Sequence, residues 1–189
     1  MNRNARTVLM DSFKELLTMK SMDKITVKDI CEHCNVKRQT FYNHFINILD
    51  IFKALFYEEL SAEIGQNKTF ETWQKGFLAT MYYLRDNSSM IYHIFASSYW
   101  PEINTYCAEL SNRVLDRVVG ECMEKMGVEL KDNDRKFIVH FYRRVFNGLI
   151  IDWVRDEMVE EPEIILKKLL TMVSGEIPRS VAGFIKELN

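Results

Sequence analysis

The stretch "ITVKDICEHCNVKRQTFYNHF", residues 25–45, decides the fold of this chain. Thr26 is a good N-cap for the short apolar-periodic segment that follows it, and Asp29 stands where the acid of a capping box belongs. Asn35 can adopt the left-handed conformation that ends such a helix. A further short helix is expected from about Lys37 to Phe45. Two short helices separated by about three residues predict a helix-turn-helix.

The later of these two helices combines cationic, hydrogen-bonding and aromatic side chains. Apolar Ile30, Val36 and Phe41 are expected to hold the helix pair together. The side chains at the start of the helix then point outward, where they can enter the major groove of DNA. Arg38 can bond the edge of guanine, and Gln39 the edge of adenine. Further hydrogen-bonding side chains can reach phosphates, which set register without reading sequence: Thr40, Tyr42 and His44.

These residues resemble the DNA-binding signature of the TetR/AcrR family of bacterial regulators. The signature has a Thr before a short helix, an Ile-small pair, a small-Gly-Val turn, a Thr-apolar-Tyr core and a closing His-Phe pair. The matching positions are Thr26, Ile30-Cys31, Cys34-Asn35-Val36, Thr40-Phe41-Tyr42 and His44-Phe45. The resemblance covers about residues 5–55, and "RQTFYN" is similar to the branch that includes the dihydroxyacetone-kinase activator DhaS.

The resemblance implies a homodimeric repressor, or less often an activator, whose C-terminal helices form a small-molecule pocket and a two-fold interface. It implies that phosphates are contacted by Thr26, Tyr42 and His44. It also implies a set of candidate base readers: Lys37, Arg38, Gln39 and Thr40. Three positions depart from the signature. Asn35 replaces the turn glycine, Lys37 replaces the capping serine, and Ile48 replaces a lysine that would contact phosphate.

The whole chain has the composition of an all-α protein. Its 189 residues include seven Gly and three Pro, which favours long helices over turn-rich β-structure. Helical periodicity recurs along the chain and predicts about nine or ten helices, without a strand pattern. We expect a helix-turn-helix DNA-binding domain over residues 1–47 and a helical ligand-binding and dimerisation domain over residues 48–189.

Charge is distributed unevenly along the chain, although the net charge is only −2. Residues 1–55 hold nine Lys or Arg against six Asp or Glu, giving +3 there and −5 in the rest. A basic head on an acidic body favours a polyanionic partner such as double-stranded DNA. No apolar run approaches the ~20 residues of a membrane span, and no signal peptide is evident. We expect a cytoplasmic protein with no membrane partner.

The later helices are delimited by caps and prolines. An amphipathic stripe begins at Phe70 and Trp73, and "DNSS", residues 86–89, interrupts it. Pro101 suits the first turn of the next helix, which stops at Gly127. A helix from about Asn133 to Met158 follows. Pro162 opens another helix, and Pro178 is expected to kink or end it.

Aromatic residues of the second half suggest a ligand pocket for an unknown small-molecule effector. Tyr and Trp combine a large apolar face with a polar tip, which suits a pocket wall. The candidates are Trp73, Tyr83, Tyr92, Trp100, Tyr106 and His140. Ordinary packing in the core is the alternative for each of them.

The helix at 133–158 is apolar over more than half of its circumference, whereas a surface helix needs only one apolar stripe. It is therefore either central to the chain or packed against a second copy, and Gly148 would allow a close helix approach. We expect dimerisation here, together with 163–177. The candidate interface residues are Phe137, Phe141, Phe146, Gly148, Trp153 and Leu169.

Other chemistries have weaker support in the sequence. Cys31 and Cys34 form a C-x-x-C pair, but buried thiols also pack as small apolar groups, and no second ligand pair has zinc spacing. No phosphate-binding Gly-rich loop or hydrolase motif occurs, so we expect no enzyme, no cofactor and no metal. The alternative function is a helical protein-interaction module or co-regulator, which Ile48 and the modest +3 charge would suit.

Overall fold

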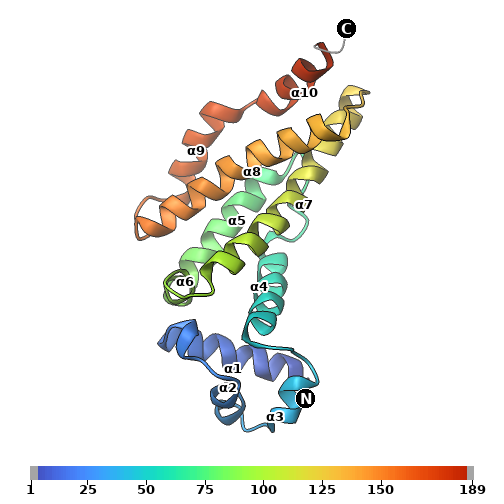
Figure 1. The fold of residues 1–189 in the computed structure, drawn as a ribbon. Coiled ribbons are helices and arrows are strands. Elements are labelled where there is room, and N and C mark those ends of the chain that lie inside the picture. The colour runs from blue at the N-terminus through green and yellow to red at the C-terminus, as the bar shows by residue number, and fades with distance from the viewer. Residues whose placement is uncertain (1–3, 187–189) are drawn as a thin grey trace. The chain divides into compact units, whose positions relative to one another are not determined.

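The computed structural model describes residues 4–186 and confirms the all-α class (Figure 1). That part of the chain contains ten α-helices, one 3₁₀-helix and no strand: α1 (Ala5–Met19), η1 (Met22–Lys24), α2 (Val27–His33), α3 (Arg38–Tyr42), α4 (Ile48–Ile64), α5 (Trp73–Asp86), α6 (Ser88–Phe95), α7 (Trp100–Met126), α8 (Asp132–Arg155), α9 (Pro162–Val173) and α10 (Glu176–Lys186). Over these residues, every helix is too short or too polar to span a bilayer.

The chain divides into two compact units. Unit 1 comprises the residues up to Ala62 together with Leu84–Tyr106, and unit 2 comprises Glu63–Tyr83 together with the residues from Cys107 onward. This division by packing differs from the division expected at residue 47, because segments beyond that residue pack on α1. Lys14 of α1 pairs with Glu59 of α4 at 2.8 Å, and α6 lies against α1 as well.

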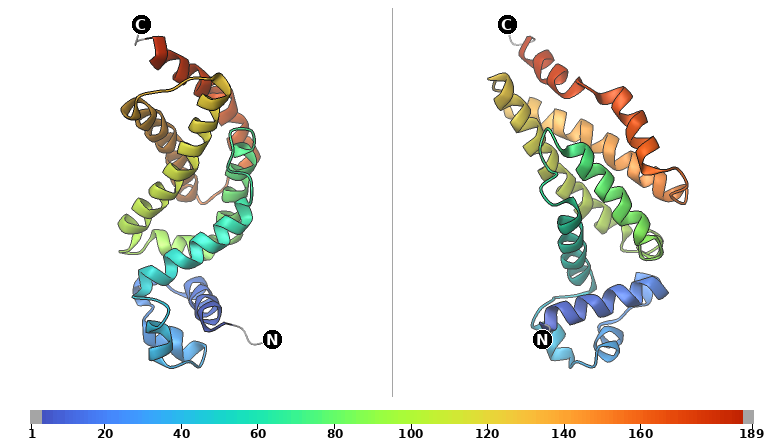
Figure 2. Two further views of the ribbon diagram at one scale, coloured as in Figure 1. Left: turned by 90° about the vertical axis from the view of Figure 1, so that its right-hand side faces the viewer. Right: turned by 180° about the vertical axis from the view of Figure 1, so that it is seen from behind.

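The core of unit 1 is built on the apolar stripe of α1. Leu9, Phe13 and Leu17 are fully buried, as their helical spacing predicts. α1 packs across α2 and α3 (Figure 2), and these helices contribute Ile30 and Phe41, both also fully buried. The helix-turn-helix is therefore fixed to α1 by apolar contacts.

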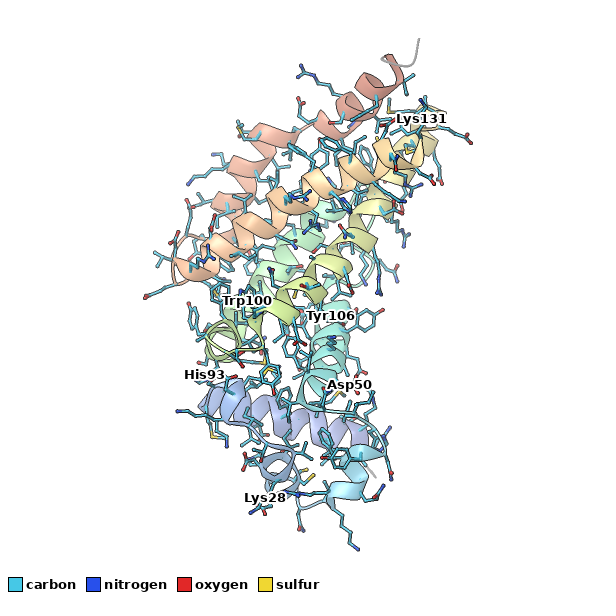
Figure 3. All side chains as sticks on the ribbon, viewed as in Figure 1. Lys28, Asp50, His93, Trp100, Tyr106 and Lys131 are labelled. Carbon is cyan, nitrogen blue, oxygen red and sulfur yellow. The ribbon has the colours of Figure 1, made fainter. Side chains whose placement is uncertain are left out.

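α6 completes unit 1 on another side of α1. Its apolar face is buried through Met90, Ile91 and Ile94. His93, labelled in Figure 3, places Nδ1 2.6 Å from the carbonyl oxygen of Leu17 in the last turn of α1. This bond satisfies a carbonyl that has no partner within its own helix.

Unit 2 is organised around α8. The buried face of this helix carries Tyr142, Phe146 and Trp153, and Phe146 also contacts Trp73 of α5 at a ring separation of 5.4 Å. α8 ends at Arg155, three residues before the expected Met158. The helix stops there because Glu157 and Met158 both take positive φ, and the Met158 amide bonds back to the Trp153 carbonyl at 2.8 Å.

The prediction that Pro178 kinks or ends α9 is wrong. α9 ends at Val173, and the chain turns at Gly175, whose φ is +77°. Pro178 lies in the first turn of α10, where a backbone N–H has no helical partner to lose. Proline is therefore tolerated here. The sequence pattern alone does not show whether Pro178 lies at the start of a new helix or inside the previous one.

Candidate nucleic-acid interface

The helix-turn-helix begins with a complete capping box at α2. The Asp29 amide donates to Thr26 Oγ1 at 3.1 Å, and the Thr26 amide donates to Asp29 Oδ2 at 2.9 Å. The hydrogen bonds from Thr26 hold the pKa of the Asp29 carboxyl below its ordinary value. The turn that follows α2 has Asn35 at φ 53°, so an asparagine takes the left-handed conformation expected of the family's glycine. Both local predictions are confirmed.

The buried side of α3 fixes the orientation of its exposed side. The Phe41 ring is fully buried and lies 5.7 Å from the Phe45 ring. Ser12 of α1 donates its hydroxyl to the Ile30 carbonyl at 3.1 Å, which ties α2 to α1. Rotation of α3 about its own axis would expose Phe41 to water, and so the opposite face is held outward.

That outward face carries the residues expected to meet DNA. Lys37 is the N-cap of α3, and its ammonium group, which can only donate, makes no capping bond to the helix amides. Thr40 is half-buried beside Phe41. The exposed members of the predicted set are Thr26, Lys37, Arg38, Gln39, Tyr42 and His44. The exposed side of α3 and its N-cap thus gathers two cations and several neutral hydrogen-bonding groups.

Two exposed residues of this surface were not predicted as site residues. Asn43 accepts a hydrogen bond from Gln39 Nε2 at 3.1 Å, and the spacing of four residues between them was the signal that could have identified the pair. Ile46, in the connection between α3 and α4, is 79% exposed. Ile48, which replaces the family lysine, is instead buried, so this side chain packs within unit 1 rather than facing DNA.

α4 begins at Ile48 with a cap of its own. Asn47 Oδ1 accepts from the Asp50 amide at 2.9 Å, and Asp50 Oδ2 accepts from the Ile46 amide at 2.9 Å. Asp50 and Lys28 of α2 are both labelled in Figure 3. This cap fixes the short connection between α3 and α4, and therefore the position of Ile46.

The C-x-x-C pair is part of this packing. Cys31 is buried, and burial raises the pKa of its thiol. Cys34 is half-buried and donates its thiol to the Ile30 carbonyl at 3.1 Å. Both thiols are free. Between residues 4 and 186, His, Cys, Asp and Glu side chains do not gather in any group of three that could hold a metal ion.

The six predicted pocket residues are divided between the two units. Tyr92, Trp100 and Tyr106 belong to unit 1, where each is partly buried. The Tyr106 hydroxyl donates to the Lys53 carbonyl at 3.2 Å, and the Trp100 ring lies 4.3 Å from the Phe95 ring (Figure 3). Trp100 and Tyr106 are therefore engaged in packing within unit 1.

The other three predicted pocket residues belong to unit 2 and differ in exposure. Tyr83 is buried, Trp73 is half-buried against Phe146, and His140 is exposed on α8. Unit 2 also contains two buried polar atoms without a hydrogen-bond partner among the described residues, Asn112 Oδ1 and Arg143 Nε. Leaving such an atom unpaired costs about 1–3 kcal/mol, so a polar ligand that paired it would be stabilised.

The predicted dimer residues separate into buried and exposed sets. Phe146, Trp153 and Leu169 are at most 8% exposed and serve the core of unit 2, so they leave little surface for another chain. Phe137 and Phe141 are 63% and 53% exposed on α8. Gly148 is half-buried, and a Cβ added there would meet no atom within 4 Å, which leaves open space beside the helix.

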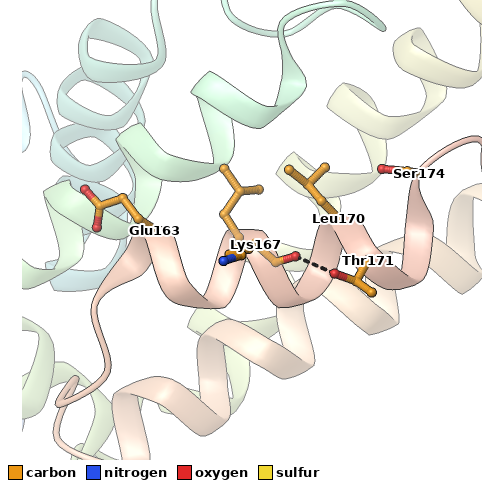
Figure 4. Close-up of a pocket in the computed structure, with 6 residues that line it drawn as sticks. Glu163, Lys167, Leu170, Thr171 and Ser174 are labelled. Carbon is orange, nitrogen blue, oxygen red and sulfur yellow. Dashed lines mark hydrogen bonds between the residues drawn. The ribbon is translucent and has the colours of Figure 1, made fainter.

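Two hollows lie along α9, on different sides of the helix. The larger, of about 840 Å³, is lined by residues of α8, α9 and the start of α10, including Phe141, Leu149 and Met172. The smaller, of about 560 Å³, is lined by Glu163, Leu166, Lys167, Leu170, Thr171 and Ser174 (Figure 4). The larger hollow thus joins the exposed apolar residues of α8 to those of α9.

Family models match most of the chain. The model described as bacterial regulatory proteins of the tetR family matches residues 9–55, and a model of a transcriptional regulator C-terminal region, TetR_C_8, matches residues 71–175. A curated relative is the HTH-type dhaKLM operon transcriptional activator DhaS of Lactococcus lactis subsp. lactis (strain IL1403). It is 26% identical over 134 residues, which are 71% of each chain.

Solved structures share this fold. The dihydroxyacetone kinase operon activator DhaS aligns with a TM-score of 0.71 at 20% identity, over 93% of this chain and 97% of that one. NalD, the secondary repressor of the MexAB-OprM multidrug efflux pump in Pseudomonas aeruginosa, aligns with a TM-score of 0.59 at 16% identity, over 93% and 96%. The N-terminal family model covers the helix-turn-helix, and the C-terminal family model covers more than half of the chain. The chain therefore belongs to the TetR family of transcriptional regulators.

Proposed function

We propose that this chain acts as a repressor that binds a palindromic operator as a homodimer and releases it in response to a small-molecule effector. The observation that carries the proposal is the outward face of α3, which exposes Lys37, Arg38, Gln39 and Tyr42 while Phe41 anchors the helix. Lysine and arginine supply affinity for phosphates, and the amide and guanidinium groups can distinguish base edges.

Dimerisation is supported by the apolar residues that unit 2 leaves exposed. Met172 of α9 is 75% exposed, and Phe137 and Phe141 of α8 are each more than half exposed. Large apolar side chains gathered on neighbouring helices favour association with another surface of the same kind. Two copies related by a two-fold axis would present two α3 helices, as a palindromic site requires. The division at residue 47 into a DNA-binding and a dimerisation part belongs to this proposal.

The effector is expected in unit 2, where two buried polar atoms have no hydrogen-bond partner among the described residues. They are the acceptor Asn112 Oδ1 and the donor Arg143 Nε. A ligand donor would satisfy Asn112 Oδ1, and a ligand acceptor would satisfy Arg143 Nε. The ligand can regulate DNA binding only if its binding free energies for the DNA-competent and the DNA-free dimer differ. The difference is typically about 1–3 kcal/mol. Repression is the simpler sign of regulation, because occupancy of the operator suffices for it.

Selection of random duplex DNA by the purified protein tests the proposal. We expect recovery of a palindrome whose half-sites are about one helical turn apart or a multiple of it. Affinity for that site should fall steeply with salt, because each phosphate contact releases counterions. A reporter gene behind the recovered site should be silenced by the protein, whereas activation would reverse the proposed sign.

The protein-interaction alternative makes the opposite prediction in the same experiment. A mainly apolar protein interface would yield no enriched DNA sequence and little salt dependence. Sedimentation of the protein alone should give a dimer under the proposed function. A monomer that selects no sequence would rule out the proposed operator reader.

A further inference from the structure

A hydrogen bond between two amides spans the exposed face of α3. Gln39 Nε2 donates to Asn43 Oδ1 at 3.1 Å, and both residues are exposed. Resting on the proposed function, we propose that Asn43 is a positioning residue that holds the Gln39 amide ready to read an adenine in each half-site. Asn43 itself would determine specificity through Gln39 rather than by touching that base.

The chemistry of the amide group suits this role. A glutamine amide has two N–H hydrogens and one carbonyl oxygen, and the bond to Asn43 uses only one of the hydrogens. The adenine reading requires that this be the hydrogen trans to the carbonyl oxygen, because the other hydrogen and the oxygen then lie side by side. Adenine offers N7 as an acceptor and N6–H as a donor at the same spacing, whereas guanine offers two acceptors there. The pre-set amide is therefore complementary to adenine and mismatched to guanine.

The helix geometry explains why Asn43 can reach Gln39. Residues four apart lie on the same side of an α-helix. α3 has only five residues, but its C-cap Asn43 still has helical angles, with φ −72° and ψ −18°. The Asn43 amide hydrogen also bonds the Gln39 carbonyl at 3.0 Å, so the backbone keeps the two side chains in register.

The benefit of the bond lies in binding rather than in folding. A glutamine side chain has three rotatable bonds, and fixing it costs more conformational freedom than fixing most other side chains. Because Asn43 fixes part of it before DNA arrives, less freedom is lost on binding. A Gln–Asn pair of this spacing favours the helical arrangement by a factor of about 1.4–2.3. A palindrome uses the pair twice, which gives about two- to fivefold.

Four variants test the assignment: Gln39→Ala, Asn43→Ala, Asn43→Asp and the double variant Gln39→Ala/Asn43→Ala. The operator recovered by the wild-type protein is synthesised with each base at every symmetric pair of positions, and affinities are measured by fluorescence anisotropy. The position read by Gln39 is the one whose preference disappears in Gln39→Ala. We expect adenine there, preferred by about 5- to 150-fold for each half-site in the wild type.

The ratio of affinities at that position is the decisive readout. Asn43→Ala should lower the adenine preference about two- to fivefold, and it should have no effect on the ratio when Gln39 is already alanine. Asn43→Asp keeps a carboxylate oxygen that can accept from Gln39, so the preference should return. Its added negative charge should weaken binding to every sequence alike.

Several outcomes overturn the inference while the proposed function survives. These are an unchanged adenine ratio in Asn43→Ala, an equal loss for all bases in that variant, or an unchanged effect of Asn43→Ala in the Gln39→Ala background. An equal loss would identify Asn43 as a phosphate contact. Failure of the wild-type protein to select any sequence overturns both proposals. Thermal unfolding of each variant checks folding, and Asn43→Ser replaces Asn43→Ala if the latter does not fold.

Discussion

Asp23 and Ser98 are joined by hydrogen bonds that connect η1 to the turn between α6 and α7. The Ser98 amide lies 3.1 Å and 3.0 Å from the two carboxylate oxygens of Asp23, and the Ser98 hydroxyl donates to Asp23 Oδ1 at 2.6 Å. Both residues belong to unit 1, where His93 of α6 also bonds the Leu17 carbonyl of α1. The segment that leads into the helix-turn-helix is therefore hydrogen-bonded to α6 through Leu17 and to the turn after α6 through Asp23.

Removal of the Asp23 carboxylate should destabilise the protein in a pH-dependent way. The hydrogen bonds from Ser98 hold the pKa of Asp23 below its ordinary value of 3.8. A lowered pKa stabilises the folded state above the unfolded-state value and stops doing so as the pH falls through the folded-state value. Urea unfolding should show Asp23→Ala less stable than wild type from pH 7 to about 5, with the difference shrinking below pH 3.8. A difference that persists at the lowest pH would contradict this account.

Phe41 should matter far more to stability than its neighbour Tyr42. Phe41 is fully buried, whereas Tyr42 is 57% exposed. Truncation of a buried phenylalanine removes apolar burial and leaves a cavity, at about 3–5 kcal/mol. Denaturant unfolding should show a loss of that size in Phe41→Ala and a change within about 0.5 kcal/mol in Tyr42→Ala. Similar losses in the two variants would mean that α3 is not anchored by its buried side.

Arg38 and Tyr42 should contribute differently to DNA binding. Arg38→Ala should cost about 1–3 kcal/mol on the operator and relax the base preference at one position. Tyr42→Phe removes a hydroxyl assigned to phosphate, so it should weaken operator and random DNA similarly. Competition titrations with both DNAs separate the two effects. An equal loss on operator and random DNA in Arg38→Ala would reject that residue as a base reader.

The turn of the helix-turn-helix should tolerate glycine but not alanine. Asn35 has a φ of 53°, which an alanine adopts only at a cost of about 1–2 kcal/mol. Asn35→Ala should therefore lower the free energy of unfolding by about that amount. Asn35→Gly should have a stability close to wild type, because glycine adopts positive φ readily. Equal destabilisation by both substitutions would show that the asparagine side chain, and not the backbone angle, matters.

Charge placed on α8 should dissociate the proposed dimer. Phe141 is 53% exposed, so Phe141→Asp should not disturb the core of unit 2, but it would place a carboxylate in the interface. Sedimentation equilibrium should show a monomer. Tyr57→Asp is the matched control, because this residue is 50% exposed on α4 of unit 1, and it should leave the dimer intact. Dimers of unchanged affinity in Phe141→Asp would place the interface elsewhere.

Local signals in the sequence were sufficient for most of the helix-turn-helix. Thr26 and Asp29 form the predicted capping box, and Asn35 takes the predicted left-handed angle, because both features depend on residues close in sequence. The end of α3 was less predictable. It was expected near Phe45, but the helix ends at Tyr42, and a turn follows in which the Phe45 amide still donates to the Phe41 carbonyl at 2.9 Å. No glycine or proline marks the end of this helix in the sequence, so its last residue could not be identified there.

The roles of apolar residues in unit 2 could not be assigned from periodicity. Phe141 and Phe146 stand on the same helix with the same chemistry, yet the first is exposed and the second is buried against Trp73. A helical wheel shows that two faces of α8 are apolar but not which face meets α5. Likewise, the exposed Asn43 carries no apolar signal, and its spacing of four residues from Gln39 allows a bond that only the structure shows to be formed.

The bond between His93 and the Leu17 carbonyl has a consequence for anyone who builds chimaeras from this protein. Position 17 contributes a backbone atom and can vary among apolar side chains, whereas position 93 must supply a group that can donate to it. A graft that cuts the chain after Ala62 would discard α6 and uncover the last turn of α1. A transplantable module therefore has to include the distant segment Leu84–Tyr106, although the helix-turn-helix ends long before it.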